Sequence, residues 1–554
     1  MSPFTPPRNS LAGLAAHDVS KSFGPHVVLD RVRIVVGPRS RIGVIAPNGT
    51  GKSTLLRILA GIDTPDSGRV TRTPPSATVG YLPQEPERRP GETVRAYLAR
   101  RTGVAAAEQA LDTASSALAE GGAANDDRYA RALDDYLALG AADLDARIGA
   151  VLADLDLPER VLDLEMTALS GGQAARANLA AILLARFDVF LLDEPTNDLD
   201  FAGLDRLERF LHDDLAGGAV IVSHDRAFLD RTVTSVLELD EHAHTATEYA
   251  GGWAAYLAEQ ATARRHAEED YATYRAEKSR LEDRARMQRE WSVQGKAKAK
   301  KDSSEQDKHI RQFRRKTSEK VAAKSKITDR AIERLDAIDK PWEGWDLRYQ
   351  LAGAARSGDV VMRLQEAVMA RGDFCLGPVS LEIGWGERLA IVGPNGTGKT
   401  TLLLALLGRL PLAAGERYLG PGVVIGEMDQ ARATFAGEAT LLDAFMGATG
   451  LTVSEARSLL AKFGLGAEHV IRAADSLSPG ERTRAVLARF QAQGVNCLVL
   501  DEPTNHLDLP AIEQLEQALD GYDGTLLLVT HDRRLLESVD LTRAITPAGV
   551  DIEL

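Results

Sequence analysis

Two short glycine-rich segments hold residues suited to binding a phosphate chain. They are APNGTGKST at 46–54 and GPNGTGKTT at 393–401. Glycines let a backbone wrap closely around phosphates, a lysine supplies positive charge, and the following hydroxyl can bind Mg²⁺. The predicted phosphate-binding residues are Asn48, Gly49, Gly51, Lys52, Ser53, Thr54, Asn395, Gly396, Gly398, Lys399, Thr400 and Thr401. Among them, Ser53 and Thr400 are also predicted metal ligands.

Further along the chain, an apolar run ending in an acidic pair follows each of these segments. The pairs are Asp193–Glu194 and Asp501–Glu502. The aspartate can lie beside the metal, and the glutamate can orient and deprotonate an attacking water. In isolation, such a pair is about as often a helix cap. Its occurrence after a phosphate loop twice in one chain indicates catalysis.

Two histidines, His224 and His531, occupy matching places after the acidic pairs, in the segments SHD and THD. A lone histidine is usually structural. The repetition of both spacing and context argues against coincidence, so both side chains are included in the candidate site.

The elements that must position these side chains are also repeated. IGVIAPNGTGKSTLLRILAG at 42–61 recurs at 389–408, and VFLLDEPTNDLD at 189–200 recurs at 497–508. An apolar, β-branched run precedes each loop and residues at helical spacing follow it, which predicts strand, loop and helix in that order. The chain is therefore a tandem duplication of an α/β P-loop domain, with copies at about 11–250 and 355–554.

LSGGQ at 169–173 and LSPGE at 477–481 precede helix-forming runs, so Ser170 and Ser478 could be plain N-caps. With the other motifs they match the signature of ATP-binding cassette proteins, which the chain resembles over nearly all of both copies. The resemblance also identifies Gln84 and Gln430 as the glutamines that bind nucleotide and metal in that superfamily.

The resemblance implies an ATP hydrolase in which two cassettes of one chain pair head to tail, each ATP and Mg²⁺ lying between them. Site I would combine Lys52, Ser53, Gln84, Asp193, Glu194 and His224 with Ser478 and Gly480. Site II would combine Lys399, Thr400, Gln430, Asp501, Glu502 and His531 with Ser170 and Gly172. Phe23 resembles the aromatic that stacks on adenine, and the second copy has no clear counterpart. A monomer with intramolecular cassette pairing is expected.

The two copies differ where phosphate would bind. Ala46 stands where the second copy has Gly393, and Pro479 stands where the first has Gly171. Proline lacks a backbone N–H, and the β-carbon of Ala46 could crowd a tight loop. Both differences fall in site I, which is therefore expected to be the less active site.

Composition excludes several classes of cassette protein. No window of the 554 residues approaches the roughly 18 apolar residues of a membrane span, and the N-terminus does not read as a secretory signal. Cys375 and Cys497 are too few for the iron–sulfur clusters of the cassette recycling factor or the zinc modules of the excision-repair protein. Coiled coils of hundreds of residues, as in chromosome-organising relatives, are absent from the sequence. A cytoplasmic protein is expected.

A long helical linker is predicted between the copies. Residues 254–340 contain Gly295 as their one glycine and no proline, and apolar residues follow heptad-like spacing. This pattern predicts two antiparallel helices turning near 295–304, each of about 35 residues and roughly 50 Å long. The turn would therefore be held far from the cassettes.

The linker is basic although the chain is acidic. Residues 284–326 hold fifteen Lys or Arg against five Asp or Glu, a net charge of +10, whereas the whole chain carries −14 and the remainder therefore −24. A solvated helix face is the alternative, but a basic tip on an acidic body is suited to reaching one RNA site. Trp291 and His309 could stack on bases.

With this linker, the chain resembles the ABC-F family, whose members act on ribosomes. The resemblance implies that the linker enters the exit-tRNA site and directs its tip to peptidyl-tRNA and the peptidyl-transferase centre, so rRNA and tRNA are expected partners. The first copy has some 38 extra residues between Gln84 and Ser170, placed at about 100–145. They resemble the family's ribosome-contacting arm, and their acidic character favours a ribosomal protein as partner.

The expected domains are a first cassette at 11–253, a basic linker at 254–345 and a second cassette at 355–554. The sequence leaves three functions open: protection of ribosomes against antibiotics, or rescue of stalled peptidyl-tRNA; a housekeeping factor that gates early elongation; and a motor recruited by a separate drug-exporting membrane protein. The basic linker and the arm argue against the third.

Overall fold

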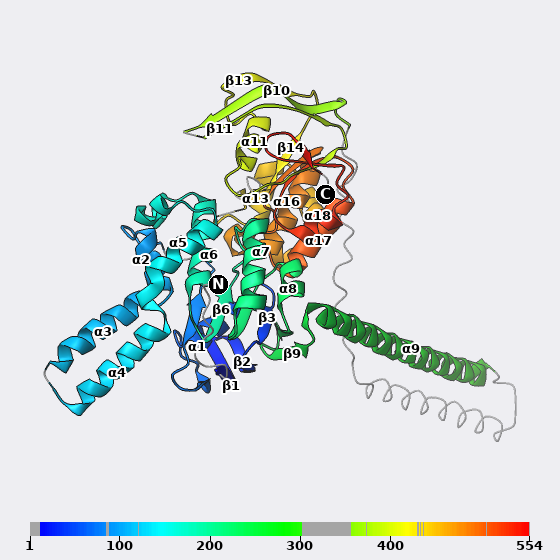
Figure 1. The fold of residues 1–554 in the computed structure, drawn as a ribbon. Coiled ribbons are helices and arrows are strands. Elements are labelled where there is room, and N and C mark those ends of the chain that lie inside the picture. The colour runs from blue at the N-terminus through cyan, green and yellow to red at the C-terminus, as the bar shows by residue number, and fades with distance from the viewer. Residues whose placement is uncertain are drawn as a thin grey trace. The chain divides into compact units, whose positions relative to one another are not determined.

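The computed structural model describes residues 12–84, 88–119, 121–301, 356–372, 374–428, 432, 434–435, 437–505 and 507–552. The chain divides into two compact units (Figure 1). One unit consists of Met1–Ala254 together with Leu347–Leu554, and the other is Ala255–Asp346. Both copies of the repeat lie in the first unit.

The first copy is built on a six-stranded sheet with the order β5-β6-β7-β3-β8-β9, parallel except for its edge pair β8 and β9. The strands are β3 Arg41–Ile45, β5 Val79–Leu82, β6 Val189–Asp193, β7 Gly218–Val222, β8 Ser235–Leu239 and β9 Ala246–Ala250. The central strands β3, β6 and β7 are buried along their whole length. Continuous apolar runs with β-branched residues suit strands covered on both faces.

An antiparallel sheet and the helices complete this copy. The sheet has the order β2-β1-β4, formed by β1 Gly13–Phe23, β2 His26–Val36 and β4 Ser67–Thr73. The helices are α1 Lys52–Ala60, α2 Val94–Arg101, α3 Val104–Leu118, α4 Ala123–Ala138, α5 Leu144–Asp154, α6 Gly171–Leu184, α7 Phe201–Arg209 and α8 Arg226–Thr232.

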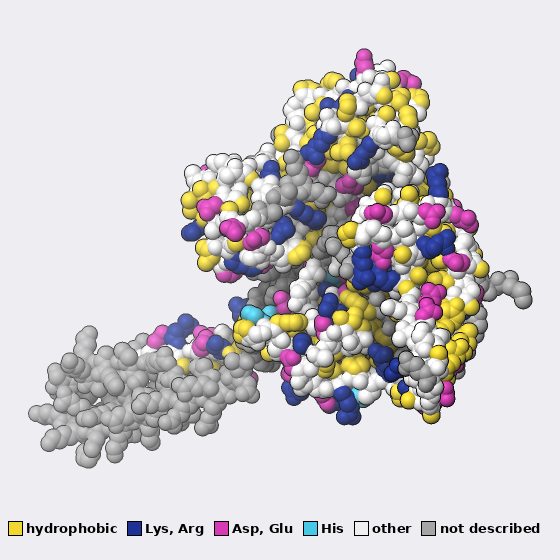
Figure 2. All heavy atoms as spheres, turned by 90° about the vertical axis from the view of Figure 1, so that its left-hand side faces the viewer, with side chains coloured by type: hydrophobic (Ala, Val, Ile, Leu, Met, Phe, Trp, Pro, Cys, Tyr) yellow, Lys and Arg dark blue, Asp and Glu magenta, His cyan; other side chains and the backbone are white. Residues whose placement is uncertain are grey.

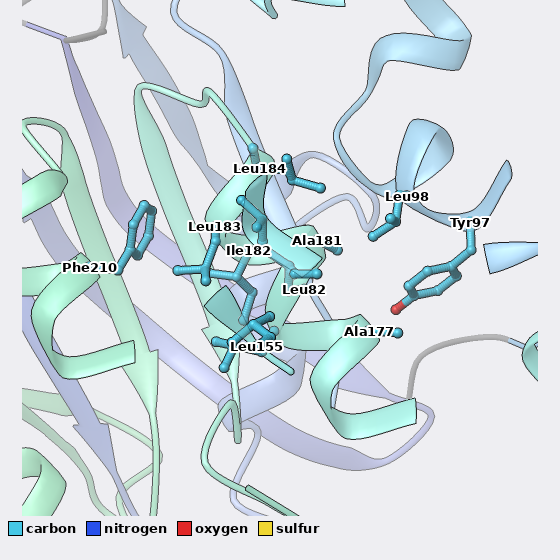
Figure 3. Close-up of a cluster of buried hydrophobic side chains, with 14 of the residues drawn as sticks. Leu82, Tyr97, Leu98, Leu155, Ala177, Ala181, Ile182, Leu183, Leu184 and Phe210 are labelled. Carbon is cyan, nitrogen blue, oxygen red and sulfur yellow. The ribbon is translucent and has the colours of Figure 1, made fainter. Parts of the chain in front are cut away.

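Alternate residues of the central strands enter two different cores. Phe190 and Leu192 of β6 join a cluster with α2, α5, α6 and α7 (Figure 3). Val189 and Leu191 of the same strand face α1 and the antiparallel sheet. In the first cluster the Tyr97 hydroxyl donates a hydrogen bond of 3.0 Å to Asn178, which satisfies its polar atom. The two cores fix the sheet between its layers, and with it the strand ends that carry the motifs.

The second copy repeats this architecture with the strand order β14-β15-β16-β12-β17-β18 and an antiparallel sheet β11-β10-β13. The strands are β10 Val360–Arg371, β11 Phe374–Gly384, β12 Arg388–Ile391, β13 Ala414–Leu419, β14 Ile425–Glu427, β15 Cys497–Asp501, β16 Thr525–Val529, β17 Arg543–Ile545 and β18 Asp551–Ile552. The helices are α11 Lys399–Leu406, α13 Leu441–Thr449, α14 Val453–Lys462, α15 Ala467–Val470, α16 Pro479–Gln493, α17 Leu509–Asp520 and α18 Arg533–Ser538. Two α/β cassettes are therefore present, as the repeat predicts.

The extra segment of the first copy contains the helical hairpin α3–α4 (Figure 1). The Asn125 side chain closes the turn by donating to the carbonyls of Ala117 and Gly121, at 2.9 and 3.0 Å. This hairpin lies within the range 100–145 that the comparison of the two copies assigns to the arm. Over the face drawn in Figure 2, acidic and basic side chains are interspersed.

A single helix, α9 Gly252–Lys301, begins the linker. Fifty residues at 1.5 Å each make it about 75 Å long. It continues through Gly295 to Lys301, which lies within the range 295–304 expected for the turn, and the residues that follow lie outside the described part of the chain. One glycine costs a helix only about 1 kcal/mol relative to alanine, and its neighbours are good helix formers. The predicted second helix and His309 lie outside the described residues. None of the described helices has the length and hydropathy needed to span a bilayer.

Candidate functional site

The two phosphate loops join a buried strand to a helix in each cassette. Lys52 follows β3 and opens α1, and Lys399 follows β12 and opens α11. Lys52 Nζ donates to the Ala46 carbonyl at 2.7 Å, and Lys399 Nζ donates to the Gly393 carbonyl at 2.8 Å. The two loops therefore hold their lysines alike, and Ala46 introduces no difference in this contact.

The glycines of these loops are needed by their backbones. Gly51 has φ 99° and Gly398 has φ 101°, a region that L side chains rarely adopt. A β-carbon at Gly51 would lie 2.4 Å from Val28, and one at Gly398 would lie 2.9 Å from the Phe374 ring. Both glycines are the N-caps of their helices and leave the first N–H groups without a side-chain cap. These N–H groups and the adjacent lysine form a site for an anion such as the phosphates of ATP.

The acidic pairs lie at the carboxyl ends of β6 and β15, beside these loops. Asp193 accepts a hydrogen bond of 3.3 Å from the Tyr81 hydroxyl, and Asp501 accepts one of 3.4 Å from Thr400. Glu194 and Glu502 follow with φ 49° and 44°, a strained conformation for residues with a β-carbon. Their backbones are held there by the neighbouring strands, since each N–H donates to a strand carbonyl, Val222 or Val529.

Burial changes the protonation of these groups. It raises the pKa of Glu502 to about 8 and also raises the pKa of Glu194. It lowers the pKa of His224 to about 3 and of His531 to about 4, so both imidazoles are neutral at physiological pH. A carboxylate with a raised pKa is a competent proton acceptor once it is ionised. A neutral imidazole can both donate and accept a hydrogen bond.

Each histidine lies against the glutamate of its own cassette, because β7 and β16 run beside the strands that carry the acidic pairs, and His531 also contacts Lys399. His224 Nε2 is 3.3 Å from Glu194 Oε1. His531 Nε2 is 2.9 Å from Lys399 Nζ and 3.5 Å from Glu502 Oε1. The structure therefore brings together the lysine, glutamate and histidine that the sequence predicted for each site.

A cavity of about 890 Å³ surrounds Lys399 and draws residues from both cassettes. The second cassette contributes the predicted residues Asn395, Gly396, Gly398, Lys399, Thr400, Thr401, Asp501, Glu502 and His531. The first cassette contributes Ser170 and Gly172 of its signature, together with Glu194 and His224. A β-carbon on Gly172 would lie 2.9 Å from that of Asn395, so this close approach requires glycine.

A second cavity, of about 500 Å³, surrounds Lys52. Its lining includes the predicted residues Phe23, Asn48, Gly49, Gly51, Lys52, Ser53, Thr54, Gln84, Asp193, Glu194 and His224. From the opposite signature only Pro479 lines it, and Ser478 and Gly480 do not. Ser478 and Ser170 each cap a helix, with Glu481 and Gln173 completing capping boxes. Gln430 lies outside the described residues.

Two aspartates that the sequence interpretation missed connect the cassettes. The Asn395 N–H donates to Asp200 Oδ2 at 2.9 Å, and the Asn48 N–H donates to Asp508 Oδ2 at 3.1 Å. Each aspartate is also the N-cap of its own helix, α7 or α17. The repeated ends of TNDLD and TNHLD could have identified them. Their partners lie in the other cassette, which no local pattern indicates.

The second site also has an aromatic residue that the sequence interpretation did not find. Phe374 and Arg371 line the Lys399 cavity, at the end of the β10–β11 hairpin. In the first cassette Phe23 lies at the end of the corresponding β1–β2 hairpin. Phe23 pairs with His26, whereas Arg371 pairs with Phe374. The aromatic residue therefore lies on the first strand of the hairpin in the first cassette and on the second strand in the second cassette. The distance in sequence to the lysine therefore differs, 29 residues in one copy and 25 in the other.

A family model described as ABC transporter matches residues 29–197 and 376–505. The tylosin resistance ATP-binding protein TlrC of Streptomyces fradiae is 37% identical over 94% of this chain and 95% of its own length. The energy-dependent translational throttle protein EttA of Haemophilus influenzae is 32% identical over 94% of this chain and 90% of its own. ABC transporter F family member 2 of Arabidopsis thaliana is 30% identical over 95% and 75%.

Among solved structures, one titled RNase-L Inhibitor superposes with a TM-score of 0.52 at 19% sequence identity, covering 97% of this chain and 89% of its own. At this identity the likeness concerns the fold alone. A pair of cassettes in one chain therefore occurs in a solved structure of very different sequence.

Proposed function

The chain belongs to the ABC-F family of tandem ATP-binding cassette ATPases, and we propose that it binds ribosomes in its ATP-bound state and leaves after hydrolysis. The observation that carries this proposal is the long helix α9 between two cassettes that share their ATP sites. The basic segment 284–326 begins on this helix. Ribosome binding implies a cytoplasmic location.

At each ATP site the residues have separate tasks. Lys52 and Lys399, with the N–H groups that open α1 and α11, would bind phosphate oxygens. A bound Mg²⁺ would polarise the transferred phosphoryl group, and the groups placed to hold it are the hydroxyls of Ser53 and Thr400, the carboxylates Asp193 and Asp501, and the amides of Gln84 and Gln430. Glu194 and Glu502 would accept the proton of the attacking water. His224 and His531 would donate a hydrogen bond to phosphate.

The adenine base would lie against Phe23 at site I. At site II, Phe374 and Arg371 are the residues suited to that role, since a phenyl ring and a guanidinium plane can both stack on a base. Their positions in the lining of the Lys399 cavity support this assignment.

The linker would carry the recognition of RNA. Its charge of +10 against −24 for the rest of the chain favours phosphate contacts at the tip and disfavours them on the cassettes. We propose that the tip points to peptidyl-tRNA and the peptidyl-transferase centre. The arm, α3–α4, holds seven Asp or Glu and two Arg between residues 104 and 138, which suits a basic ribosomal protein better than RNA.

Of the functions that remain open, protection of ribosomes against an antibiotic is favoured by the similarity to a tylosin resistance protein, which covers nearly all of both chains. A throttle-like role in translation is the second candidate and is supported by the similarity to EttA. The two candidate functions predict different inhibitory concentrations of tylosin. A protection factor raises the inhibitory concentration of tylosin for a sensitive host that expresses the chain, whereas a throttle leaves it unchanged.

ATP-dependent cosedimentation tests ribosome binding. Glu194→Gln combined with Glu502→Gln keeps the shape of both sites but removes the groups that activate water. This double variant should accumulate on ribosomes with ATP and inhibit translation in a cell extract, while a membrane fraction should not retain it. If it bound ribosomes no better than the wild type, or sedimented with membranes instead, the proposal would fail.

A further inference from the structure

The first turn of α7, in the first cassette, contacts the catalytic machinery of the second. Its first residue, Phe201, meets the His531 ring edge-on, with ring centroids 5.3 Å apart and an angle of 78° between the rings. The residue before it, Asp200, accepts the hydrogen bond from Asn395 described above. Two neighbouring residues of one cassette thus reach the histidine and the phosphate loop of the other.

Phe201 is fixed in this position from two sides. It packs against a small apolar cluster of the second cassette, formed by Ala390, Val392, Ala544, Leu536 and Leu541. The Arg533 guanidinium lies over its ring at 5.6 Å. Arg533 is held in turn by Asp205 and Glu208 of α7, with N–O distances of 2.7 and 2.9 Å. The half-buried ring is therefore packed against side chains of the cassette that it does not belong to.

The other polar contacts of the His531 ring are all at its Nε2 atom. Its Nε2 faces Lys399, Asn395 and Glu502, at 2.9, 3.2 and 3.5 Å, but its buried Nδ1 has no hydrogen-bond partner among the residues that the structure describes. Catalytic histidines are usually oriented by a hydrogen bond to the second nitrogen. In the second site the edge-on contact with Phe201 restrains the His531 ring instead, because aromatic contacts of this kind favour particular ring orientations.

The first site lacks this contact although it keeps the ion pair. Arg226, the counterpart of Arg533, pairs with Glu516 of α17, the counterpart of Glu208. The residue equivalent to Phe201 is Leu509, which has no ring. Within the described part of the chain, the Nδ1 atom of His224 is also buried without a hydrogen-bond partner. An aromatic side chain supplied by the opposite cassette is thus a feature of the second site.

We propose that Phe201 is a positioning residue that orients His531 across the cassette interface, so that the second site takes the orientation of its histidine from the opposite cassette. Arg533 holds the ring from its other side. The first site, with Leu509 at the equivalent position, lacks this aromatic restraint on its histidine. The inference rests on the proposed role of His531 in hydrolysis.

Phe201→Leu removes the ring but keeps an apolar side chain for the cluster that surrounds it. In the Glu194→Gln background, where the second site provides the turnover, kcat should fall about three- to tenfold, the effect expected from losing one aromatic contact. The KM for ATP should stay within twofold, because Phe201 does not line the cavity. Leu509→Met, the matched control at the equivalent helix position, should leave both constants unchanged.

A double-mutant cycle with His531→Gln separates positioning from packing. If Phe201 acts through His531, Phe201→Leu should cost nothing further once His531 is replaced. A full second loss in that background, or wild-type kcat for Phe201→Leu alone, would overturn the inference and leave the ATPase assignment intact. Wild-type turnover of His531→Gln would overturn the inference together with the proposed role of the histidine.

Discussion

Asp200 of the first cassette accepts a hydrogen bond from the backbone N–H of Asn395 in the phosphate loop of the second, at 2.9 Å. Asp508 and Asn48 make the reciprocal contact at 3.1 Å. Each aspartate thereby couples the start of a helix in its own cassette to the nucleotide site of the other. The pairing of the cassettes and the shape of both ATP sites depend on the same carboxylates.

Replacing Asp200 with Asn tests this coupling. Asparagine still caps α7, so the cassette should fold normally, but a neutral acceptor bonds the Asn395 N–H more weakly. A loss of about 1 kcal/mol is expected, which would raise the KM for ATP about fivefold. Asp508→Asn should act at the first site in the same direction. Asp112→Asn, on the exposed arm, is the control. An equal increase of the KM for ATP in this control would contradict a coupling through Asp200.

The two sites should contribute unequally to turnover. Pro479, which has no backbone N–H to donate, lines the Lys52 cavity. At the other site, Gly172 lines the Lys399 cavity and approaches its phosphate loop closely. Steady-state ATPase rates of Glu194→Gln and Glu502→Gln, measured singly, report the difference. The Glu502 variant should lose more activity. Equal losses, or a larger loss in the Glu194 variant, would contradict the asymmetry.

ATP hydrolysis should increase with pH through the pKa of Glu502. Burial raises the pKa of this carboxyl to about 8, so it is largely protonated below that pH and cannot accept a proton from water. The value of kcat/KM, which reports the free enzyme, should therefore rise between pH 6.5 and about 8.5. The residual activity of Glu502→Gln depends on Glu194, whose pKa burial raises to about 7, so its rise should be shifted to lower pH. A rise that stayed centred near pH 8 in this variant would identify a different base at the second site.

The same shift affects stability. A carboxyl whose pKa is raised on folding stabilises the folded state below its unfolded pKa, and that contribution is lost as pH rises through about 8. Without nucleotide, the wild-type melting temperature should fall as pH rises from 6 to 9. Glu502→Gln should show a smaller fall, since its amide does not ionise. Thermal melts of both proteins in the same buffers measure the difference.

The basic end of α9 should supply electrostatic affinity for ribosomes. Changing Lys296, Lys298, Lys300 and Lys301 to Ala preserves helix-forming residues and should leave ATP hydrolysis without ribosomes unchanged. Ribosome binding should weaken, and the slope of log affinity against log salt should become shallower, because fewer counterions are released. An unchanged slope would mean that these charges only solvate the helix.

The adenine assignment at the second site is tested with Phe374→Ala. In the Glu194→Gln background, the KM for ATP should rise at least fivefold, since stacking on one base is worth about 1–3 kcal/mol. Tyr418→Ala removes a half-exposed ring from β13 of the same antiparallel sheet and serves as the control. If both variants bound ATP equally well, Phe374 would have no part in the site.

The sequence by itself determined the chemistry within each cassette. Lys52, Glu194 and His224 follow three neighbouring strands, and residues at the carboxyl ends of parallel strands meet at one edge. Because local periodicity encodes strand, loop and helix, the motifs were enough to predict this grouping. The turn of the linker stays a prediction, since α9 passes through Gly295 to Lys301 and the residues that follow lie outside the described part of the chain.

Only the tertiary structure decided what each cassette gives the other. Asp200 and Asn395 are 195 residues apart, and nothing in either neighbourhood indicates the hydrogen bond between them. Phe201 is an ordinary apolar residue in its own helix and becomes informative only where it meets His531. Phe374 lies on the second strand of its hairpin and Phe23 on the first, so their distances in sequence to the lysine of the phosphate loop differ. Contacts of this kind depend on how packed surfaces fit together, and short-range patterns do not record that fit.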